Sequence, residues 1–332
     1  MIINPRNYFQ DSLSLLKKIT PGRFWNYIKI LFSYKLSRIR KHPYIWAGPF
    51  SLSFETASVC NLKCAECMAG QGKVIRNRKL MKPEVALEKL ELHRQSAFYC
   101  NLYFQGEPFL HPEIYAIIRS AAENKYYSVI STNGHFLDEK NCREIIESGL
   151  SRLIVSLDGL EQETYETYRK GGSFEKVAAG ILRLSEMKKE VRSPHPFLVV
   201  QFLVNKTNEH QMGDVEKYVR TLGADKLDFK SMQIYTERGI KEFSPLNKKY
   251  NRYKDGEKGR NTLSGCFRLW SHMVYTSDGE VVPCCYDKIP EYSTGSTESS
   301  PRELWKSPAM QDFRKVLLAG EQTPSICSNC GG

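Results

Sequence analysis

The chain has 332 residues, of which 41% are hydrophobic and 26% are charged, and its formal net charge is +11. These proportions are typical of a globular protein and exclude a disordered chain. The excess positive charge is local, because between Asp11 and Glu55 there is no acidic residue and there are eight Lys or Arg. One basic segment argues against a nucleic-acid-binding catalytic face, so we expect no nucleic-acid partner.

The ten Cys fall in clusters and are too sparse for a disulfide scaffold. No secretory cleavage site is evident within residues 1–16, and no uninterrupted apolar run is long enough to span a bilayer. We therefore expect a cytoplasmic protein whose clustered thiols bind metal.

Residues 1–50 are predicted to form a basic arm around one helix at 20–42, with Pro21 in its first turn and His42-Pro43 at its end. An apolar stripe recurs at helical spacing along this helix. The stripe consists of Trp25, Ile28, Phe32, Leu36 and Ile39. It either packs on the body of the protein or makes a peripheral contact with an anionic membrane, and we favour packing because apolar stripes usually serve a core.

Between residues 51 and 235, short apolar segments alternate with helical patterns about six times. The predicted strands are 51–59, 101–104, 127–131, 152–157, 197–204 and 226–230, and the predicted helices are 81–95, 111–124, 138–148, 174–190 and 209–222. This alternation predicts an α/β fold with a parallel sheet and right-handed crossovers. The strands are mostly short apolar runs, which is typical of a sheet covered on both sides, and the periodicity does not tell an open sheet from a closed one. Residues 236–264 are rich in polar residues and Gly and are predicted to be a linker, and residues 265–332 form a separate Cys-bearing module.

Three Cys, Cys60, Cys64 and Cys67, lie within eight residues directly after the first predicted strand. Three thiolates suit an iron-sulfur cluster or zinc, yet a closed structural site normally takes four ligands. One coordination position is left for a ligand from outside the motif, which points to catalysis. The CxxxCxxC motif resembles the signature of the radical S-adenosylmethionine (SAM) enzymes. The resemblance implies a [4Fe-4S] cluster on these Cys, with the amino and carboxylate groups of SAM bound to its remaining iron.

The resemblance also implies a partial (β/α)6 TIM-like barrel, with the chemistry at the C-terminal strand ends. Gly106 and Glu107 follow the second strand and resemble the family's GGEP motif, which receives the SAM amino group, although Gln105 replaces the first Gly. The other family-matched residues at strand ends are Ser131, Asn133, Ser156 and Asp158. Arg169 is a candidate partner of the SAM carboxylate. The alternatives are a Gly-Glu-Pro turn that binds no ligand, ordinary Asn-Gly and Asp-Gly turns, and a solvated Arg169.

The C-terminal module has four Cys that together can close a metal-sulfur site, namely Cys266, Cys284, Cys327 and Cys330. Their pattern resembles the SPASM domain, in the shortened form called twitch, which implies one auxiliary [4Fe-4S] cluster. A four-thiolate zinc site is the alternative. Cys285 is a spare ligand, a buried thiol or a hydrogen-atom donor, whereas Cys100 and Cys142 are expected to pack as small hydrophobes.

By family analogy, the first cluster donates an electron to SAM, and the resulting 5'-deoxyadenosyl radical removes a hydrogen atom from an unreactive C–H bond. An oxidation would pass a second electron to the auxiliary cluster, whereas an epimerisation would need a hydrogen donor such as Cys285. Gln201 and Lys230 are candidate substrate contacts on the last strands. Lys230 is also a candidate base if burial lowers its pKa, although a solvated Lys is the simpler expectation.

These features predict a radical SAM oxidoreductase or epimerase that acts on a hydroxyl-bearing carbon of a small-molecule or lipid-linked substrate. Its electron donor would be a protein such as flavodoxin or ferredoxin. Peptide-modifying members often carry an N-terminal recognition domain of strands and helices, which residues 1–50 do not resemble. The alternatives are a peptide-modifying radical SAM enzyme and a non-enzymatic zinc or iron-sulfur protein.

Overall fold

The structure is a computed structural model that describes residues 1–253, 265–320 and 323–330. Within these ranges, nine strands form one sheet in the order β6-β5-β4-β3-β2-β1-β7-β8-β9. The strands are β1 (Ser51–Phe54), β2 (Tyr99–Asn101), β3 (Tyr127–Thr132), β4 (Arg152–Ser156), β5 (Phe197–Val204), β6 (Lys226–Ser231), β7 (His272–Tyr275), β8 (Glu280–Val282) and β9 (Gly295–Ser296). Strands β1 to β7 make parallel pairs with their neighbours, whereas the pairs β7–β8 and β8–β9 are antiparallel. The predicted α/β class with a partial barrel is therefore confirmed.

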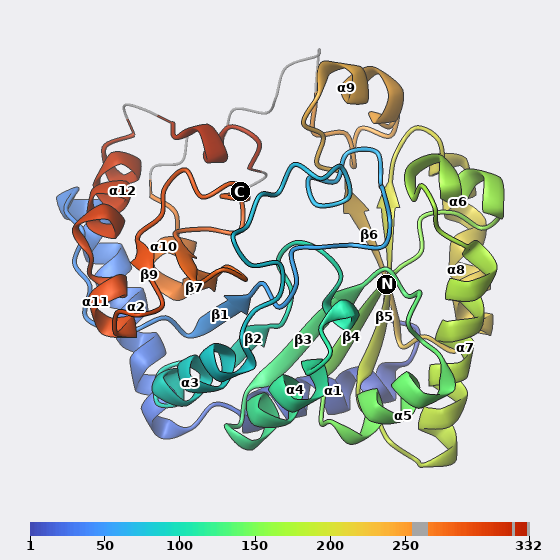
Figure 1. Cartoon of the computed structure of the whole chain (residues 1–332), viewed down its shortest axis with the longest axis horizontal. Helices are drawn as coiled ribbons and strands as arrows, with labels where there is room; N and C mark the ends of the chain where they lie inside the picture. The colour runs from blue at the N-terminus through green and yellow to red at the C-terminus, as the bar shows by residue number, and fades with distance from the viewer. Residues whose placement is uncertain (254–264, 321–322, 331–332) are drawn as a thin grey trace.

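Helices connect the parallel strands and cover the outside of the curved sheet (Figure 1). They are α3 (Pro83–His93), α4 (Ile114–Glu123), α5 (Glu139–Glu147), α6 (Gln162–Tyr168), α7 (Phe174–Glu190) and α8 (Met212–Thr221), with short 3-10 turns at Pro108–Leu110 and Glu209–Gln211. Helix α4 shows why they pack there, because Ile114, Ile117, Ile118 and Ala121 bury one face at helical spacing.

Two predicted strands have different bounds in the structure. The strand expected at 51–59 ends at Phe54, because the backbone of Thr56 and Ser58 turns to pair with Met81 and Lys79. The strand expected at 101–104 lies earlier, at Tyr99–Asn101. The helix α6 was not predicted.

The N-terminal arm contains two helices, α1 (Pro5–Lys17) and α2 (Pro21–Arg40), and not the single helix that we predicted. The start of α1 follows from Asn4, whose side chain accepts a hydrogen bond from the backbone of Asn7, and from Pro5 in the first turn. Helix α1 lies against the N-terminal ends of the strands: Asp11 accepts from the Tyr127 hydroxyl and pairs with Arg152, the first residues of β3 and β4.

We expected α2 to pack on the body of the protein through its apolar stripe, but α2 packs mainly through a different face. The buried positions of α2 are Arg23, Ile30, Ser33 and Ser37. Three of the five residues of the predicted apolar stripe are turned outward, with Trp25 62%, Phe32 61% and Ile39 77% exposed, whereas Ile28 and Leu36 are half-buried. Among the helices of the described ranges, none is both long and apolar enough to cross a membrane.

The predicted linker contains a helix, α9 (Glu237–Phe243). Thr236 caps its start, because the Thr236 side chain accepts a hydrogen bond from the backbone of Gly239. Residues 254–264 of that segment lie outside the described residues. The C-terminal module has α10 (Arg268–Ser271), the hairpin of β7 and β8, β9, α11 (Pro301–Trp305), α12 (Pro308–Ala319) and a 3-10 turn at Ser325–Cys327. Its strand β7 pairs with β1, so the module extends the sheet of the core.

Candidate functional site

The loop after β1 places Cys60, Cys64 and Cys67 in one apolar cluster, with Tyr168 and Met232 among its members. Two of the three sulfurs face backbone donors: Leu62 N lies 3.4 Å from Cys60 Sγ, and Gly70 N lies 3.4 Å from Cys67 Sγ. N–H donors of this kind stabilise thiolates, the form that binds metal. Burial raises the pKa of the free Cys64 thiol to about 11, so loading of metal should release protons from this loop.

Gly106 follows β2 in a left-handed conformation, with φ +68°. A Cβ at this position would lie 2.6 Å from the carbonyl oxygen of Val59 and closer still to that of Ala57, so only Gly fits against the start of the Cys loop. Gln105, which stands where the family motif has its first Gly, is buried next to Gly106.

Glu107 is buried and receives three hydrogen bonds. Its donors are Thr132 Oγ1 at 2.8 Å, Asn133 N at 2.8 Å and Phe109 N at 3.2 Å. Burial raises the pKa of Glu107 to about 7, and these hydrogen bonds oppose that rise. Thr132 was not among the predicted residues, although it ends a strand one position before the predicted Asn133.

Asn133 connects the third strand end to the Cys loop. Its side-chain amide donates to Asn61 Oδ1 at 2.8 Å and faces Cys60 Sγ at 3.6 Å. Ser131 is half-buried and Ser156 is buried at the neighbouring strand ends. The structure thus brings the predicted residues of β3 and β4 to the same edge of the sheet as the three Cys.

Arg169 is largely buried and is not the solvated side chain that was the alternative. Its Nε pairs with Asp158 Oδ2 at 2.6 Å, and its Nη1 lies 3.9 Å from Cys64 Sγ. Asp158 also accepts from Leu203 N at 2.7 Å, which fixes the carboxylate at the ends of β4 and β5. The guanidinium therefore has its remaining donors near the Cys loop, where a carboxylate of SAM is expected.

Glu66, inside the Cys motif, was also missed by the sequence analysis. Its carboxylate accepts from Tyr235 N at 2.8 Å and from Thr236 Oγ1 at 2.7 Å, in the segment between β6 and α9. The Cys loop is therefore anchored to the far end of the parallel sheet. The spacing of the Cys gave no signal for this contact, because its partners lie about 170 residues away.

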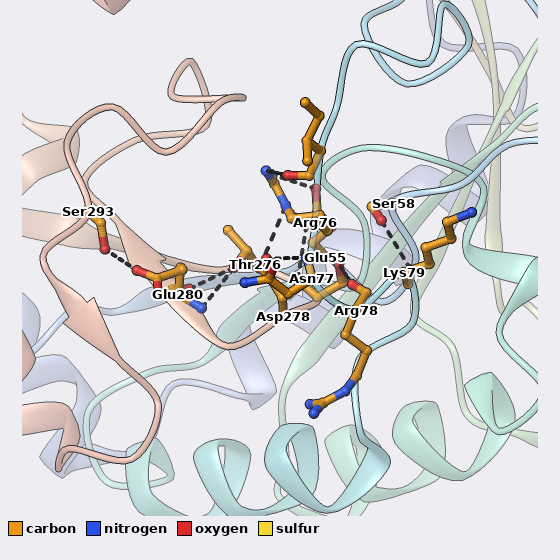
Figure 2. Close-up of polar contacts among 12 residues, drawn as sticks. Glu55, Ser58, Arg76, Asn77, Arg78, Lys79, Thr276, Asp278, Glu280 and Ser293 are labelled. Atoms are coloured by element: carbon orange, nitrogen blue, oxygen red, sulfur yellow. Dashed lines mark hydrogen bonds and ion pairs between the residues drawn. The ribbon is translucent and has the colours of Figure 1, made fainter.

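A buried polar network joins the segment after the Cys loop to the C-terminal hairpin (Figure 2). Arg76 Nε lies 2.7 Å from Glu55 Oε2, and both side chains are fully buried. Ser277 N donates to the same carboxylate at 2.9 Å, and Asn77 N donates to Asp278 Oδ2 at 3.0 Å. The end of β1 is thereby held to the turn between β7 and β8.

The C-terminal Cys lie near one another around the end of the chain. Burial raises the pKa of the Cys327 thiol to about 12, and the neighbouring Cys266 and Cys330 raise it further. Cys284 is close to Cys266 and directly beside Cys285. Arg268 Nη1 donates to Cys285 Sγ at 3.2 Å. The buried positions of Cys100 and Cys142 match the expectation that they pack as small hydrophobes.

Within the described residues, no three His, Cys, Asp or Glu side chains converge on the position of one metal ion. A cubane does not require that convergence, because each thiolate binds a different iron atom. Both Cys groups supply the soft, partly buried thiolates that such clusters take, and the N–H donors near their sulfurs suit them. The donor sets therefore fit two iron-sulfur clusters.

A cavity of about 610 Å³ opens between β1, β2, β7 and the Cys285 segment. Its polar floor consists of Ser51, Ser53, Asn101 and His272. His272 lies 2.9 Å from Ser51 Oγ and 3.1 Å from Ser53 Oγ, to which Asn101 Nδ2 donates at 3.1 Å. Burial lowers the pKa of His272 to about 4, so this imidazole is neutral at neutral pH.

Lys230 is exposed on the edge strand β6 and does not line this cavity. The burial that would make it a base is absent, which corrects its assignment as a catalytic residue. Gln201 is half-buried on β5 and is also absent from the cavity lining.

Comparison with known proteins identifies two segments of the chain. Residues 54–219 match the model of the radical SAM superfamily, and residues 266–331 match that of the SPASM iron-sulfur cluster-binding domain. A GTP 3',8-cyclase from Peptoclostridium acidaminophilum is 26% identical over 284 residues, which are 82% of this chain and 72% of that protein.

Two solved structures share the fold. One is Streptococcus suis SuiB bound to S-adenosylmethionine, with a TM-score of 0.62, 14% identity and coverage of 90% of this chain and 75% of that one. The other is BtrN in complex with AdoMet and 2-DOIA, with a TM-score of 0.52, 20% identity and coverage of 86% of this chain and 93% of that one. The two matched segments imply a SAM-binding [4Fe-4S] cluster, an auxiliary iron-sulfur cluster and SAM as cofactors. The chain belongs to the radical SAM superfamily, whose members are enzymes.

Proposed function

We propose that this enzyme removes a hydrogen atom from a hydroxyl-bearing carbon of a non-peptide substrate held in the cavity beside β1, β2 and β7. The observation that carries the proposal is the polar floor of Ser51, Ser53, Asn101 and His272. Each hydroxyl offers one donor and two acceptors, and the neutral imidazole and the amide add further capacity. Such a floor suits a substrate with several hydroxyl groups, because buried donors and acceptors need partners.

The walls of the cavity favour a negatively charged substrate. Arg268 and Lys288 line it, and no carboxylate is among the described residues of its lining. Within the described part of the chain, neither cation forms an ion pair within 4.0 Å of an acidic side chain. A phosphate or carboxylate on the substrate would complement them, which is consistent with a phosphorylated or lipid-linked substrate.

SAM on its cluster would supply the radical that takes the hydrogen atom, and the residues of the cavity would hold the substrate and exclude water. Oxidation would then remove a second electron and a proton from the substrate, and an auxiliary cluster held by Cys266, Cys284, Cys327 and Cys330 would serve as the electron acceptor. Epimerisation instead returns a hydrogen atom to the opposite face, for which Cys285 is the candidate. The hydrogen bond from Arg268 favours the thiolate of Cys285, which has no hydrogen atom to give. We therefore propose oxidation first and epimerisation second.

The substrate class is tested by comparing the metabolites of cells with and without the gene by mass spectrometry. Oxidation predicts a product two hydrogens lighter than its precursor, and that precursor should turn over with the purified, cluster-loaded enzyme under reductant. The same reaction in D₂O separates the two outcomes. Epimerisation through a thiol adds one solvent deuterium to the product, whereas oxidation adds none at the reacting carbon. Release of 5'-deoxyadenosine only in the presence of a peptide would overturn the proposal.

Peptide modification is the second candidate, because the fold is shared with SuiB, which has also been solved bound to the precursor peptide SuiA. Enzymes of the superfamily act on small-molecule or peptide substrates and take electrons from flavodoxin or ferredoxin. A donor of that kind is proposed for this chain as well. A peripheral contact of residues 20–42 with a membrane also stays a proposal, and it depends on the surface of the arm and not on the cavity.

A further inference from the structure

We propose that α2 forms a docking surface for an anionic lipid bilayer. The surface is made of large apolar side chains that face outward from this helix. Its members are Phe24 (50% exposed), Trp25 (62%), Phe32 (61%) and Ile39 (77%). Single exposed apolar residues are ordinary, but a group of this size on one short segment marks an interaction site.

The rotation of α2 about its axis is fixed by polar contacts on its inner face. Arg23 is 2% exposed, and its guanidinium donates to the carbonyl oxygens of Lys18 and Asn124, both at 2.8 Å, and of Arg94 at 3.0 Å. Asn26 donates to Gly48 O at 2.9 Å one turn further along the helix. Turning α2 to bury its apolar stripe would break these bonds and leave a buried guanidinium without partners, which is strongly unfavourable. The outward stripe is therefore a stable feature of the fold.

The charge around the stripe selects the partner. No acidic residue lies between Asp11 and Glu55, whereas Lys29 and Lys35 lie one helical turn before and after Phe32. Both Lys are exposed. An apolar stripe with Trp and Phe, flanked by Lys and Arg, has the features of a helix that lies in the interface of an anionic membrane. None of the helices in the described ranges can cross a bilayer, so the attachment would be to the surface.

Among the described residues that line the cavity beside β1, β2 and β7, none belongs to α1 or α2. Helix α1 contacts the first residues of β3 and β4, whereas the Cys loop, Glu107 and Asn133 follow the ends of strands β1 to β3 (Figure 1). Docking through the arm would thus leave the site accessible. This inference stands apart from the proposed substrate, because it uses none of the residues of the cavity.

Vesicle sedimentation with the full-length, cluster-loaded protein tests the proposal. Wild type should sediment with vesicles of phosphatidylcholine containing about one third phosphatidylglycerol, and much less with phosphatidylcholine alone or in high salt. The variant Trp25→Ser/Phe32→Ser should lose at least about tenfold in partitioning, since each change removes a large apolar contact. The matched control is Leu246→Ser, which changes a residue that is 79% exposed on another part of the chain and should bind like wild type.

A spectroscopic readout places the contact at the stripe. The fluorescence of wild type should shift to the blue when anionic vesicles are added, and Trp25→Phe should lose that shift while it still sediments. Iron content and SAM cleavage should be unchanged in all three variants. The proposal is wrong if wild type does not bind anionic vesicles at low salt or if Trp25→Ser/Phe32→Ser binds as well as wild type. It is equally wrong if the stripe instead holds two copies of the chain together without any affinity for vesicles.

Discussion

At the scale of single residues, the site depends on a few side chains that hold the strand ends against the Cys loop. Glu107 is the centre of this arrangement, because donors from β3 and from its own turn converge on its two oxygens. Its neighbour Gly106 lets the turn approach the carbonyls that precede Cys60. The same turn thus positions both the residues proposed to bind SAM and the Cys proposed to bind the cluster.

Replacement of Gly106 by Ala should therefore weaken SAM binding. The added Cβ would collide with two backbone carbonyls and must also adopt a positive φ, so the turn and the Cys loop would move apart. We expect at least about a tenfold loss of SAM affinity, equivalent to about 1.4 kcal/mol, measured by equilibrium dialysis with the loaded protein. The control is Gly72→Ala, whose φ is +66° but whose Cβ would meet open space. Equal losses in the two variants would mean that backbone strain alone is responsible.

The sequence predicted that the candidate site residues lie near one another, because residues that follow parallel strands meet at one edge of a sheet. Glu107, Asn133 and Asp158 lie at such strand ends, whereas Arg169 follows α6 and joins them through its ion pair with Asp158. Thr132 and Glu66 could not be found in this way. Their roles depend on which atom faces a partner, and in the case of Glu66 on a contact with a segment that is distant in sequence.

At the scale of elements, α2 shows a limit of sequence periodicity. The spacing of Trp25, Phe32 and Ile39 correctly predicted a helix, but it could not tell which face the fold would bury. The inner face is held by Arg23, whose carbonyl partners come from the ends of other helices. Such partners exist only after the chain has folded, so the apolar stripe was assigned to the wrong side.

The buried pair of Arg76 and Glu55 joins the two sides of the Cys loop and contacts the turn between β7 and β8 through Ser277 and Asp278. Replacing Arg76 by Met should leave the Glu55 carboxylate buried without its ion partner, and we expect the free energy of unfolding to fall by about 3 to 5 kcal/mol. Denaturant unfolding of the loaded protein measures this loss. The double variant Glu55→Gln/Arg76→Met should recover part of it, because no unpaired charge then stays buried.

The exposed pair of Arg143 and Glu139 provides the comparison for this prediction. Their charged atoms are 3.4 Å apart, with side chains that are 61% and 76% exposed. Arg143→Met should cost less than about 1 kcal/mol, since surface ion pairs are screened by water. A similar small loss for Arg76→Met would show that the network in Figure 2 does not hold the two segments together.

At the scale of the whole molecule, the core and the C-terminal module share one sheet. Four residues of β1 pair with β7, from Ser51 with His272 to Phe54 with Tyr275. The sequence predicted two units separated by a linker, because a long polar segment lies between them. It could not show that the second unit returns to the edge of the first, since pairing between distant strands leaves no local pattern. We expect the two parts to unfold together.

His93 lies at the junction of the two parts and should make their stability depend on pH. It belongs to α3, and its Nε2 lies 2.7 Å from the hydroxyl of Tyr275 in β7. Burial, with a further contribution from Lys89, lowers the pKa of His93 to about 4 from an ordinary value of 6.5. Between these two values the unfolded chain binds a proton that the folded protein does not, so the free energy of unfolding falls as the pH falls.

From about pH 7.5 to about pH 5.5, this linkage should cost wild type about 1.3 kcal/mol relative to His93→Gln. The quantity to compare is the loss of unfolding free energy between the two pH values in each protein. The value at a single pH is not enough, because His93→Gln also alters the contact with Tyr275 and shifts stability at every pH. Denaturant unfolding at both pH values measures it. The variant His210→Gln, which changes an exposed His, should keep the wild-type dependence. If His93→Gln also loses the same stability as wild type on acidification, the imidazole is not held neutral at the junction, and the shared sheet is more open to water there than the structure shows.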